Sequence, residues 1–296
     1  MDTSEICNAE EDEFQQLPVA IPRLGLNLHC YQGFWHAPLA LRGMIPFQIQ
    51  FQALDTDIIV ASFPKCGTTW LKALTFTTVN RHQFAMDENP LLTSNPHQLV
   101  RSLEYDLYMN NPFPDLDNSS LYNPRLFATQ VPYTSLPTSI KDSDCKIVFI
   151  CRNPMDMFIS LWVFRHELRD ESLEPVSIDE AFDMFCHGVL EFVPFIDYVL
   201  GYWKESQENP NKILFLQYED LKEDVNYRVK ELVMFLGVPF TEEEERQGVV
   251  EERAKICSFD SLKELEVNKK GVHTFGAPNE TSSKKAETFV VPHRVF

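Results

Sequence analysis

A lysine, a glycine and two threonines stand together in segment 62–70, which reads Ser-Phe-Pro-Lys-Cys-Gly-Thr-Thr-Trp. An apolar run precedes the segment and a helical pattern follows it, so free backbone N–H groups and the positive end of a helix dipole would face an anion. Lys65 adds a positive charge, and the hydroxyls of Thr68 and Thr69 add donors. We therefore expect this junction to bind a phosphate group.

The same residues have a less specific interpretation, a simple turn in which Gly67 takes a positive φ angle and Lys65 points into solvent. A lone Gly-Thr-Thr would favour that turn, whereas lysine, glycine, two threonines and Trp70 at one junction favour phosphate binding. The loop is not a Walker A motif, because the lysine precedes the glycine and the GxxxxGK spacing is absent. Without that motif, and without an obvious Mg²⁺-binding carboxylate after a strand, a nucleoside-phosphate kinase is the less favoured alternative.

A second junction, 151–154 (Cys-Arg-Asn-Pro), again separates an apolar run from a helical pattern. Ligands of open α/β sheets bind beyond the carboxyl ends of the strands, where an arginine such as Arg152 suits bidentate capture of phosphate. Ser160, two turns into the helix, can donate to the same group. The alternatives are a surface ion pair between Arg152 and Asp156, and a small residue at a helix contact for Ser160. In a third junction, Tyr218 either stacks on a base or is a core tyrosine.

The elements that position these junctions follow from the hydrophobic pattern. Unbroken apolar runs at 57–63, 146–151 and 212–218 fit strands buried on both faces, as in a parallel sheet covered by helices. The alternation of strands and helices implies a single α/β three-layer domain with a central parallel sheet and a P-loop-like strand–loop–helix. We expect helices over 68–81, 154–169, 178–205 (kinked or divided at Pro194) and 221–236. We expect an acidic disordered tail over 1–18, the domain over 19–271, and an irregular, atypical or truncated C-terminus over 272–296.

Composition restricts the partners. The 296 residues contain 26 Lys+Arg and 44 Asp+Glu, a net charge of −18, which disfavours non-specific binding of nucleic acid. Seven cysteines without a CxxC pair indicate reduced thiols in a cytoplasmic protein. The acidic N-terminus disfavours a signal peptide, and charges interrupt the longest apolar stretch, 184–203, which favours a core helix over a membrane span. No spacing of His, Cys, Asp or Glu suggests a metal site.

Five motifs in order resemble the cytosolic sulfotransferases: PKxGTTWLKAL, FATxxPYTSLP, CRNPxDxxISLW, YEDL and CSFxxLKxLEVNK. The plant flavonol and steroid branch is the most similar, through segments 33–35 and 51–57. The resemblance runs from about residue 28 to about 271. It implies transfer of a sulfuryl group from 3′-phosphoadenylyl sulfate (PAPS) to a hydroxyl of a small phenolic or steroid-like acceptor, without a metal. The dimerisation motif of many relatives is missing, so a monomer is expected.

The resemblance also assigns roles to residues. It implies that the loop 65–70 holds the 5′-phosphosulfate, that Arg152 and Ser160 hold the 3′-phosphate, and that Tyr218 and segment 257–259 lie around the adenosine. The nucleotide-binding residues implied are Lys65, Cys66, Gly67, Thr68, Thr69, Trp70, Arg152, Ser160, Tyr218, Cys257, Ser258 and Phe259. An acceptor pocket is predicted from aromatic residues that are also plausible core residues, namely Phe34, Trp35, Tyr105, Phe127, Tyr133 and Trp162.

Two departures from the family pattern concern catalysis. Gln130 stands at the position of the family's general-base histidine, and an amide cannot take up a proton at physiological pH. We therefore expect strongly impaired turnover, with Lys65 still stabilising the leaving phosphate. The alternative is a non-catalytic nucleotide-binding relative. His166 is a weaker candidate for a replacement base than for a solvent-facing residue. From Gly271 onward the Arg-Lys-Gly and Gly-Asp-Trp motifs are absent, and the pair at 284–285 is expected to face solvent rather than replace them.

Overall fold

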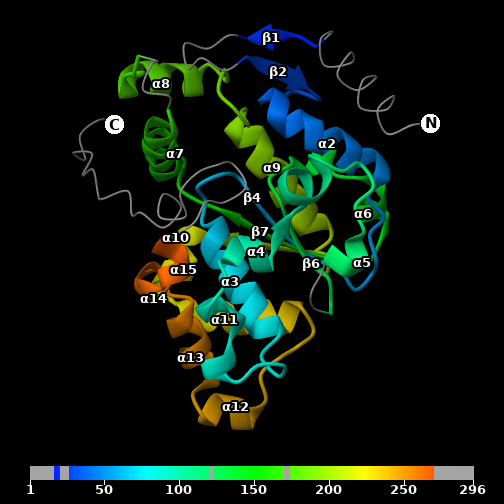
Figure 1. Ribbon diagram of the computed structural model, residues 1–296, viewed down its shortest axis with the longest axis vertical. Helices are drawn as coiled ribbons and strands as arrows, with labels where there is room; N and C mark the ends of the chain where they lie inside the picture. Colours follow the sequence, from blue (N-terminus) through cyan, green and yellow to red (C-terminus); the bar gives the residue numbers. More distant parts are fainter. Residues whose placement is uncertain (1–16, 21–26, 120–122, 170–173, 270–296) are drawn as a thin grey trace.

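The computed structural model describes residues 17–20, 27–119, 123–169 and 174–269. Within them, a five-stranded sheet in the order β5-β6-β4-β7-β8 has all neighbouring strands parallel. Helices lie on both of its faces (Figure 1), which confirms the predicted α/β class. A second, antiparallel sheet joins β1 (Val19–Ala20), β2 (Leu28–Tyr31) and β3 (Phe34–His36). The central strands are β4 (Ile58–Ser62), β5 (Arg101–Ser102), β6 (Leu126–Thr129), β7 (Lys146–Cys151) and β8 (Ile213–Gln217).

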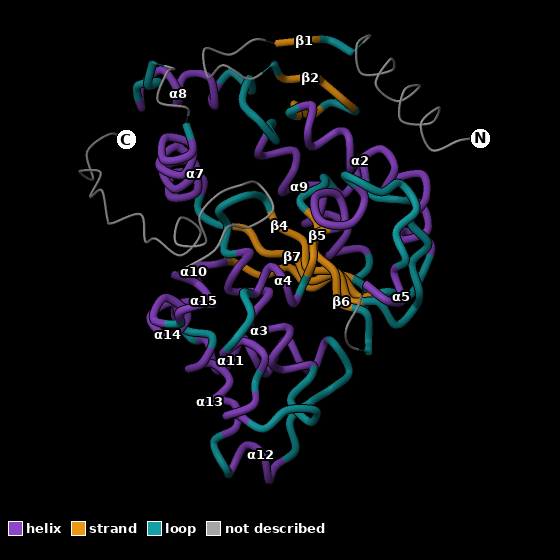
Figure 2. Tube along the Cα trace, in the orientation of Figure 1, coloured by secondary structure: helices purple, strands orange, loops and turns teal. Residues whose placement is uncertain are grey.

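The three predicted strands are β4, β7 and β8, and they form the centre and one side of the sheet. Every residue of β4 is buried, as expected for a strand covered on both faces. Along β7, Ile147 and Phe149 belong to the apolar core on one face, whereas Val148 and Ile150 belong to the core on the other face. This alternation places the sheet between two helical layers, with the sheet in the middle as Figure 2 shows.

Two helices start directly at the strand ends that the sequence singled out. Helix α3 (Thr68–Val79) follows β4, and α7 (Pro154–Leu168) follows β7. Asn153 caps α7, because its Oδ1 accepts hydrogen bonds from the backbone N–H groups of Met155 and Asp156, and Pro154 occupies the first helical position.

Two predicted helices are divided in the structure. The pattern at 178–205 forms α8 (Ile178–Cys186) and α9 (Phe195–Glu208), with Pro194 directly before α9, so the apolar stretch 184–203 is not one core helix. The pattern at 221–236 forms α10 (Tyr218–Glu223) and α11 (Val225–Phe235). The break lies at Asp224, whose carboxylate accepts a hydrogen bond from the backbone N–H of Tyr227 and caps the second helix.

One helical layer contains α2 (Pro38–Gln50), the π-helical segment η3 (Leu103–Tyr108) and α9, and the opposite layer contains α3, α11 and α13 (Val249–Ile256; Figure 1). Helix α2 approaches η3 so closely that a Cβ on Gly43 would collide with the carbonyl oxygen of Glu104. The remaining elements are η1 (Met86–Glu88), η2 (Pro90–Leu92), α4 (Pro96–Leu99), α5 (Leu116–Ser119), η4 (Tyr133–Ser135), α6 (Thr138–Asp142), α12 (Glu242–Arg246), α14 (Phe259–Glu264) and α15 (Glu266–Lys269).

The expectations for the two ends of the chain fall mostly outside the described residues. Residues 1–16 of the acidic tail lie outside them, and at its end the carbonyl of Pro18 accepts a hydrogen bond from the backbone N–H of Cys30. The expectations for 272–296, including the lysines at 284–285, also lie outside the described residues. Among the helices that are described, none combines the length and apolar character needed to cross a membrane.

Candidate active site

The carboxyl ends of the parallel strands bring five chain segments to one edge of the sheet. The loop that starts at Phe63 follows β4, Arg152 follows β7 and Tyr218 follows β8. On the other side of β4, Gln130 follows β6 and the segment η3 follows β5. All the junctions that the sequence singled out therefore leave the sheet at the edge where open α/β proteins bind their ligands.

Direct contacts join the three junctions on the β7–β8 side. Nη1 of Arg152 donates a hydrogen bond to the carbonyl oxygen of Lys65 at 3.4 Å, and its guanidinium carbon lies 4.7 Å from the ring centroid of Tyr218. The rings of Tyr218 and Trp70 meet edge to face with their centroids 5.7 Å apart. Asp156 lies 3.9 Å from Nη2 of Arg152, so the ion pair considered as the alternative is present at long range while the guanidinium also contacts the loop.

The backbone of the loop between β4 and α3 requires its glycine. Lys65 and Gly67 both have positive φ angles, +65° and +104°. A Cβ at Gly67 would lie 2.8 Å from a ring carbon of Tyr218, so a larger residue is excluded by conformation and by space. The hydroxyls of Ser62 and Thr68 lie 2.5 Å apart and connect the two ends of the loop.

The start of α3 offers backbone donors to a ligand. Gly67 is its N-cap, and among the described residues no side chain caps this end and its first turn has no acidic residue. The N–H groups of that turn therefore lack intrahelical acceptors. Nearby, Nε of Arg152 and Nε1 of Trp70 are buried and have no hydrogen-bond partner within the described part of the chain. Unpaired buried donors around a helix start are the arrangement expected where an anion binds.

The Lys65 side chain carries the second positive charge of this region. Its Nζ lies 4.2 Å from the ring centroid of Phe164 on α7. Burial lowers the pKa of Lys65 to about 8; the carboxylate of Glu167 opposes this shift and the charge of Arg152 reinforces it. The amine remains mainly protonated at neutral pH, at a position where a negative ligand would stabilise the charged form further.

The other predicted nucleotide-binding residues occupy different environments. Cys66 is fully buried, and burial raises the pKa of its thiol. Ser160 is buried on α7, and Oγ1 of Thr69 lies 3.0 Å from Nε2 of His97. Cys257, buried at the end of α13, has its thiol pKa raised by burial and belongs to the apolar core against which Trp70 and Tyr218 pack. Ser258 caps α14 by accepting the backbone N–H of Ser261, and Phe259 is the first residue of that helix.

A buried carboxylate that the sequence analysis did not identify lies beneath Gln130. The backbone N–H of Gln130 donates a hydrogen bond to Oε1 of Glu104 at 2.6 Å. Glu104 is 2% exposed, its Oε2 has no hydrogen-bond partner within the described residues, and burial raises its pKa. The available signal was an acidic residue between Leu103 and Tyr105, but a charge in an apolar pattern does not by itself indicate burial. His166, by contrast, is exposed and stacks on Trp162, with ring centroids 5.4 Å apart.

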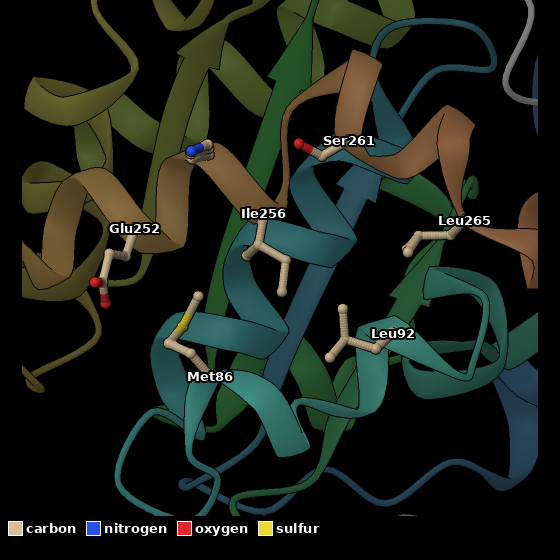
Figure 3. Close-up of a pocket in the computed structure, with 7 residues that line it drawn as sticks. Met86, Leu92, Glu252, Ile256, Ser261 and Leu265 are labelled. Carbon is tan, nitrogen blue, oxygen red and sulfur yellow. The ribbon is translucent and has the colours of Figure 1, made fainter.

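The aromatic residues predicted for an acceptor pocket all belong to one core, on the side of α2 and α9. Phe34, Tyr105 and Phe127 are buried in that core, and Trp35, Tyr133 and Trp162 pack against it. A separate cavity of about 390 Å³ lies between the segments η1 and η2 and the helices α13 and α14 (Figure 3). None of the predicted site residues lines it; its walls are formed by Met86, Leu92, Glu252, Lys255, Ile256, Ser261 and Leu265.

Comparison with known proteins connects this architecture to a family. The family model described as "Sulfotransferase domain" matches residues 55–288. Cytosolic sulfotransferase 15 of Arabidopsis thaliana is 46% identical over 96% of this chain and 82% of the relative, and cytosolic sulfotransferase 14 of the same plant is 49% identical over 87% and 76%.

Solved structures agree with the sequence relatives. The crystal structure of a candidate steroid sulphotransferase from Arabidopsis thaliana has a TM-score of 0.76 and is 41% identical, with 89% of each chain covered. A mouse sulfotransferase complexed with PAP shares the fold at 24% identity, a TM-score of 0.59, and coverage of 80% of this chain and 76% of that one. The extent of these matches, over a chain whose strand-end loops carry the motifs of the family, shows that it belongs to the cytosolic sulfotransferases and is a PAPS-dependent sulfotransferase.

Proposed function

We propose that the chain moves the sulfuryl group of PAPS to a hydroxyl of a small phenolic or steroid-like acceptor in the cytosol, at a low rate because Gln130 replaces a base. The observation that carries the proposal is the group of donors at the ends of β4, β7 and β8. There, Arg152 contacts the loop that carries Lys65, and this loop leads into the start of α3, which no side chain of the described residues caps. A chain with a net charge of −18 needs such a local cluster to attract a nucleotide with several negative charges.

The proposed roles are those that the family resemblance implies for these residues. The loop 65–70 binds the 5′-phosphosulfate through the first N–H groups of α3, its threonine hydroxyls and Lys65. Arg152 binds the 3′-phosphate together with Ser160, which lies two turns into the helix that starts next to Arg152. Tyr218, Trp70 and segment 257–259 surround the adenosine, and the rings of Tyr218 and Trp70 contact each other. The unpaired Nε of Arg152 supports this assignment, because a bound phosphate would supply its missing acceptor.

The reaction is a displacement at sulfur. The acceptor oxygen forms a bond to sulfur while the bond between sulfur and the 5′-phosphate oxygen breaks, and the proton of the acceptor hydroxyl passes to solvent water. Negative charge then develops on the leaving phosphate, where the ammonium of Lys65 stabilises it. Since the pKa of Lys65 is about 8 before any ligand binds, the amine has its charge at neutral pH.

Removal of the acceptor proton is the step that this chain supports least. The side chain of Gln130 is an amide and cannot accept a proton, while the nearby carboxyl of Glu104 is 2% exposed and does not face solvent. A positioned general base contributes roughly 10²–10⁴-fold in rate. We therefore infer slow turnover that is fastest with phenols that ionise readily, since these need the least help from a base.

Two measurements on the same protein test the proposal. Isothermal titration with adenosine 3′,5′-bisphosphate (PAP), the desulfated product, measures nucleotide binding, and turnover of PAPS with a phenol measures transfer. Binding together with slow transfer is the expected result. Binding without any transfer would identify a non-catalytic nucleotide-binding protein, and a requirement for ATP and Mg²⁺ in place of PAPS would identify a kinase. The variant K230A is a matched control, because Lys230 pairs with Glu245 on the surface, away from the strand ends.

A further inference from the structure

Three polar residues form a chain of contacts that reaches the start of α3. His97 on α4 places its Nε2 3.0 Å from Oγ1 of Thr69 and its Nδ1 3.1 Å from Nζ of Lys72. Thr69 and Lys72 both belong to α3, against which α4 packs (Figure 1). His97 therefore lies between a residue of the proposed anion site and an amine that the proposed reaction does not use.

The amine of Lys72 determines which nitrogen of the histidine carries the proton. Lys72 is 2% exposed, and burial lowers its pKa to about 8, whereas the carboxylates of Asp106 and Glu104 act in the opposite direction. The amine is thus protonated at neutral pH and can only donate hydrogen bonds. The nitrogen that faces it, Nδ1 of His97, must then accept, which places the single ring proton on Nε2.

This tautomer orients the hydroxyl of Thr69. With the ring proton on Nε2, His97 donates a hydrogen bond to Oγ1 of Thr69. The Thr69 hydroxyl accepts this bond through its oxygen, so its own proton can be donated to a different acceptor. Thr69 is the second residue of α3, beside the N–H groups that no side chain of the described chain caps. We propose that Lys72 and His97 are positioning residues of the sulfotransferase site: they turn the Thr69 hydroxyl so that its proton faces the 5′-phosphate. This inference rests on the proposed binding of the nucleotide at this helix.

The ring tautomer can be measured without altering the contacts. Nitrogen-15 spectra of the imidazole ring, recorded on the full chain at neutral pH with the signals of His97 identified by their absence in H97Q, report which nitrogen is protonated. We expect a proton on Nε2 and none on Nδ1. A proton on Nδ1, alone or on a doubly protonated ring, would overturn the inference whatever the variants below do.

Affinity for PAP then tests the connection to the ligand. T69V and H97N should each weaken PAP binding about tenfold, which is the size of a lost hydrogen bond to a charged group. The double variant should be no weaker than either single one, because both remove the same donor. H97Q should bind like the parent protein, since its amide nitrogen takes the place of Nε2. K72M should weaken binding in the parent chain and have no further effect in T69V. Independent, additive losses would overturn the inference.

A second nucleotide separates a failure of the inference from a failure of the site. Adenosine 3′-monophosphate lacks the 5′-phosphate, so its affinity should be the same for the parent, T69V and H97N. Thermal melting of each variant confirms that it folds. If the parent chain binds no PAP, the proposed function fails and this inference fails with it. If PAP binds but the variants weaken both nucleotides equally, the site stands and the positioning role of Lys72 and His97 is wrong.

Discussion

The two halves of the sheet edge offer different chemistry to a ligand. The ends of β4, β7 and β8 present two cations, Lys65 and Arg152, together with unpaired donors. The ends of β6 and β5 present the neutral amide of Gln130 above the buried carboxylate of Glu104. The first half is arranged to bind an anion, whereas in the second the amide of Gln130 cannot take up a proton and the carboxyl of Glu104 is buried. We therefore propose that nucleotide binding, in the first or nucleotide half, and proton removal, in the second or acceptor half, are separable, so that each half can be altered alone.

The largest effect is expected from introducing a base into the acceptor half, at position 130. Q130H should raise turnover with a phenol, approaching the roughly 10²–10⁴-fold gain of a positioned base, and should leave the affinity for PAP unchanged. Steady-state rates and titration of PAP measure the two quantities. Q130N, which also lacks a base, is the matched control and should show no gain. An unchanged rate in Q130H, with nucleotide and acceptor bound, would show that the missing base does not limit this protein.

Removing a charge from the nucleotide half should affect binding instead. K65A and R152A should each lower the affinity for PAP by about 1.5–3 kcal/mol, the range of a charge-assisted contact, or about 10- to 150-fold. Isothermal titration measures the loss. The surface variant K230A should bind like the parent. Equal affinity in the parent and in both site variants would remove the nucleotide from this half of the edge.

Replacing the loop glycine should disturb the same half through its backbone. G67A would force a side chain into a φ of +104° and place a Cβ against the ring of Tyr218, at a cost of about 1–3 kcal/mol in free energy of unfolding. Chemical denaturation measures this loss. The matched control is G237A, because Gly237 also has a positive φ but no atom lies within 4 Å of an added Cβ. If G67A loses no more stability than G237A, the close approach of Tyr218 is not a constraint.

The smallest effect is a pH dependence of nucleotide binding. Lys65 is charged below a pKa of about 8 and neutral above it, and an anion prefers the charged form. The affinity for PAP should therefore fall as the pH rises through 8, by up to about tenfold. Lys72 titrates in the same range, so K65R is the variant that distinguishes them. If the fall comes from Lys65, K65R flattens it; an equally steep fall in K65R would assign it to another group.

The nucleotide half was predictable from the sequence because its signals are contiguous. Each apolar run leads within a few residues to the group that carries the chemistry, as segment 62–70 and Arg152 illustrate. The elements β4, β7, β8, α3 and α7 match the expected ranges for the same reason. The roles of individual residues in nucleotide binding stay predictions that the experiments above address.

The acceptor half was less predictable because its structure depends on contacts between residues that lie far apart in the sequence. Strand β6 has only four residues and β5 two, too few for a periodic pattern, and both form by pairing with neighbours. The burial of Glu104 follows from the close approach of η3 to α2 at Gly43, which no local pattern encodes. Likewise, Asp224 fits a helix interior by spacing, but its carboxylate caps α11 and divides the predicted helix.

The separation of binding from proton removal is tested most directly by the dependence of rate on the acidity of the acceptor. Single-turnover rates are measured at saturating PAPS with a series of phenols of decreasing pKa, for the parent chain and for Q130H. The predicted result is a steep rise in rate with phenol acidity in the parent chain, a shallower rise in Q130H, and convergence of the two proteins at the most acidic phenol. Equal slopes and equal rates in both proteins would contradict it, because proton removal at position 130 would then have no part in limiting the reaction.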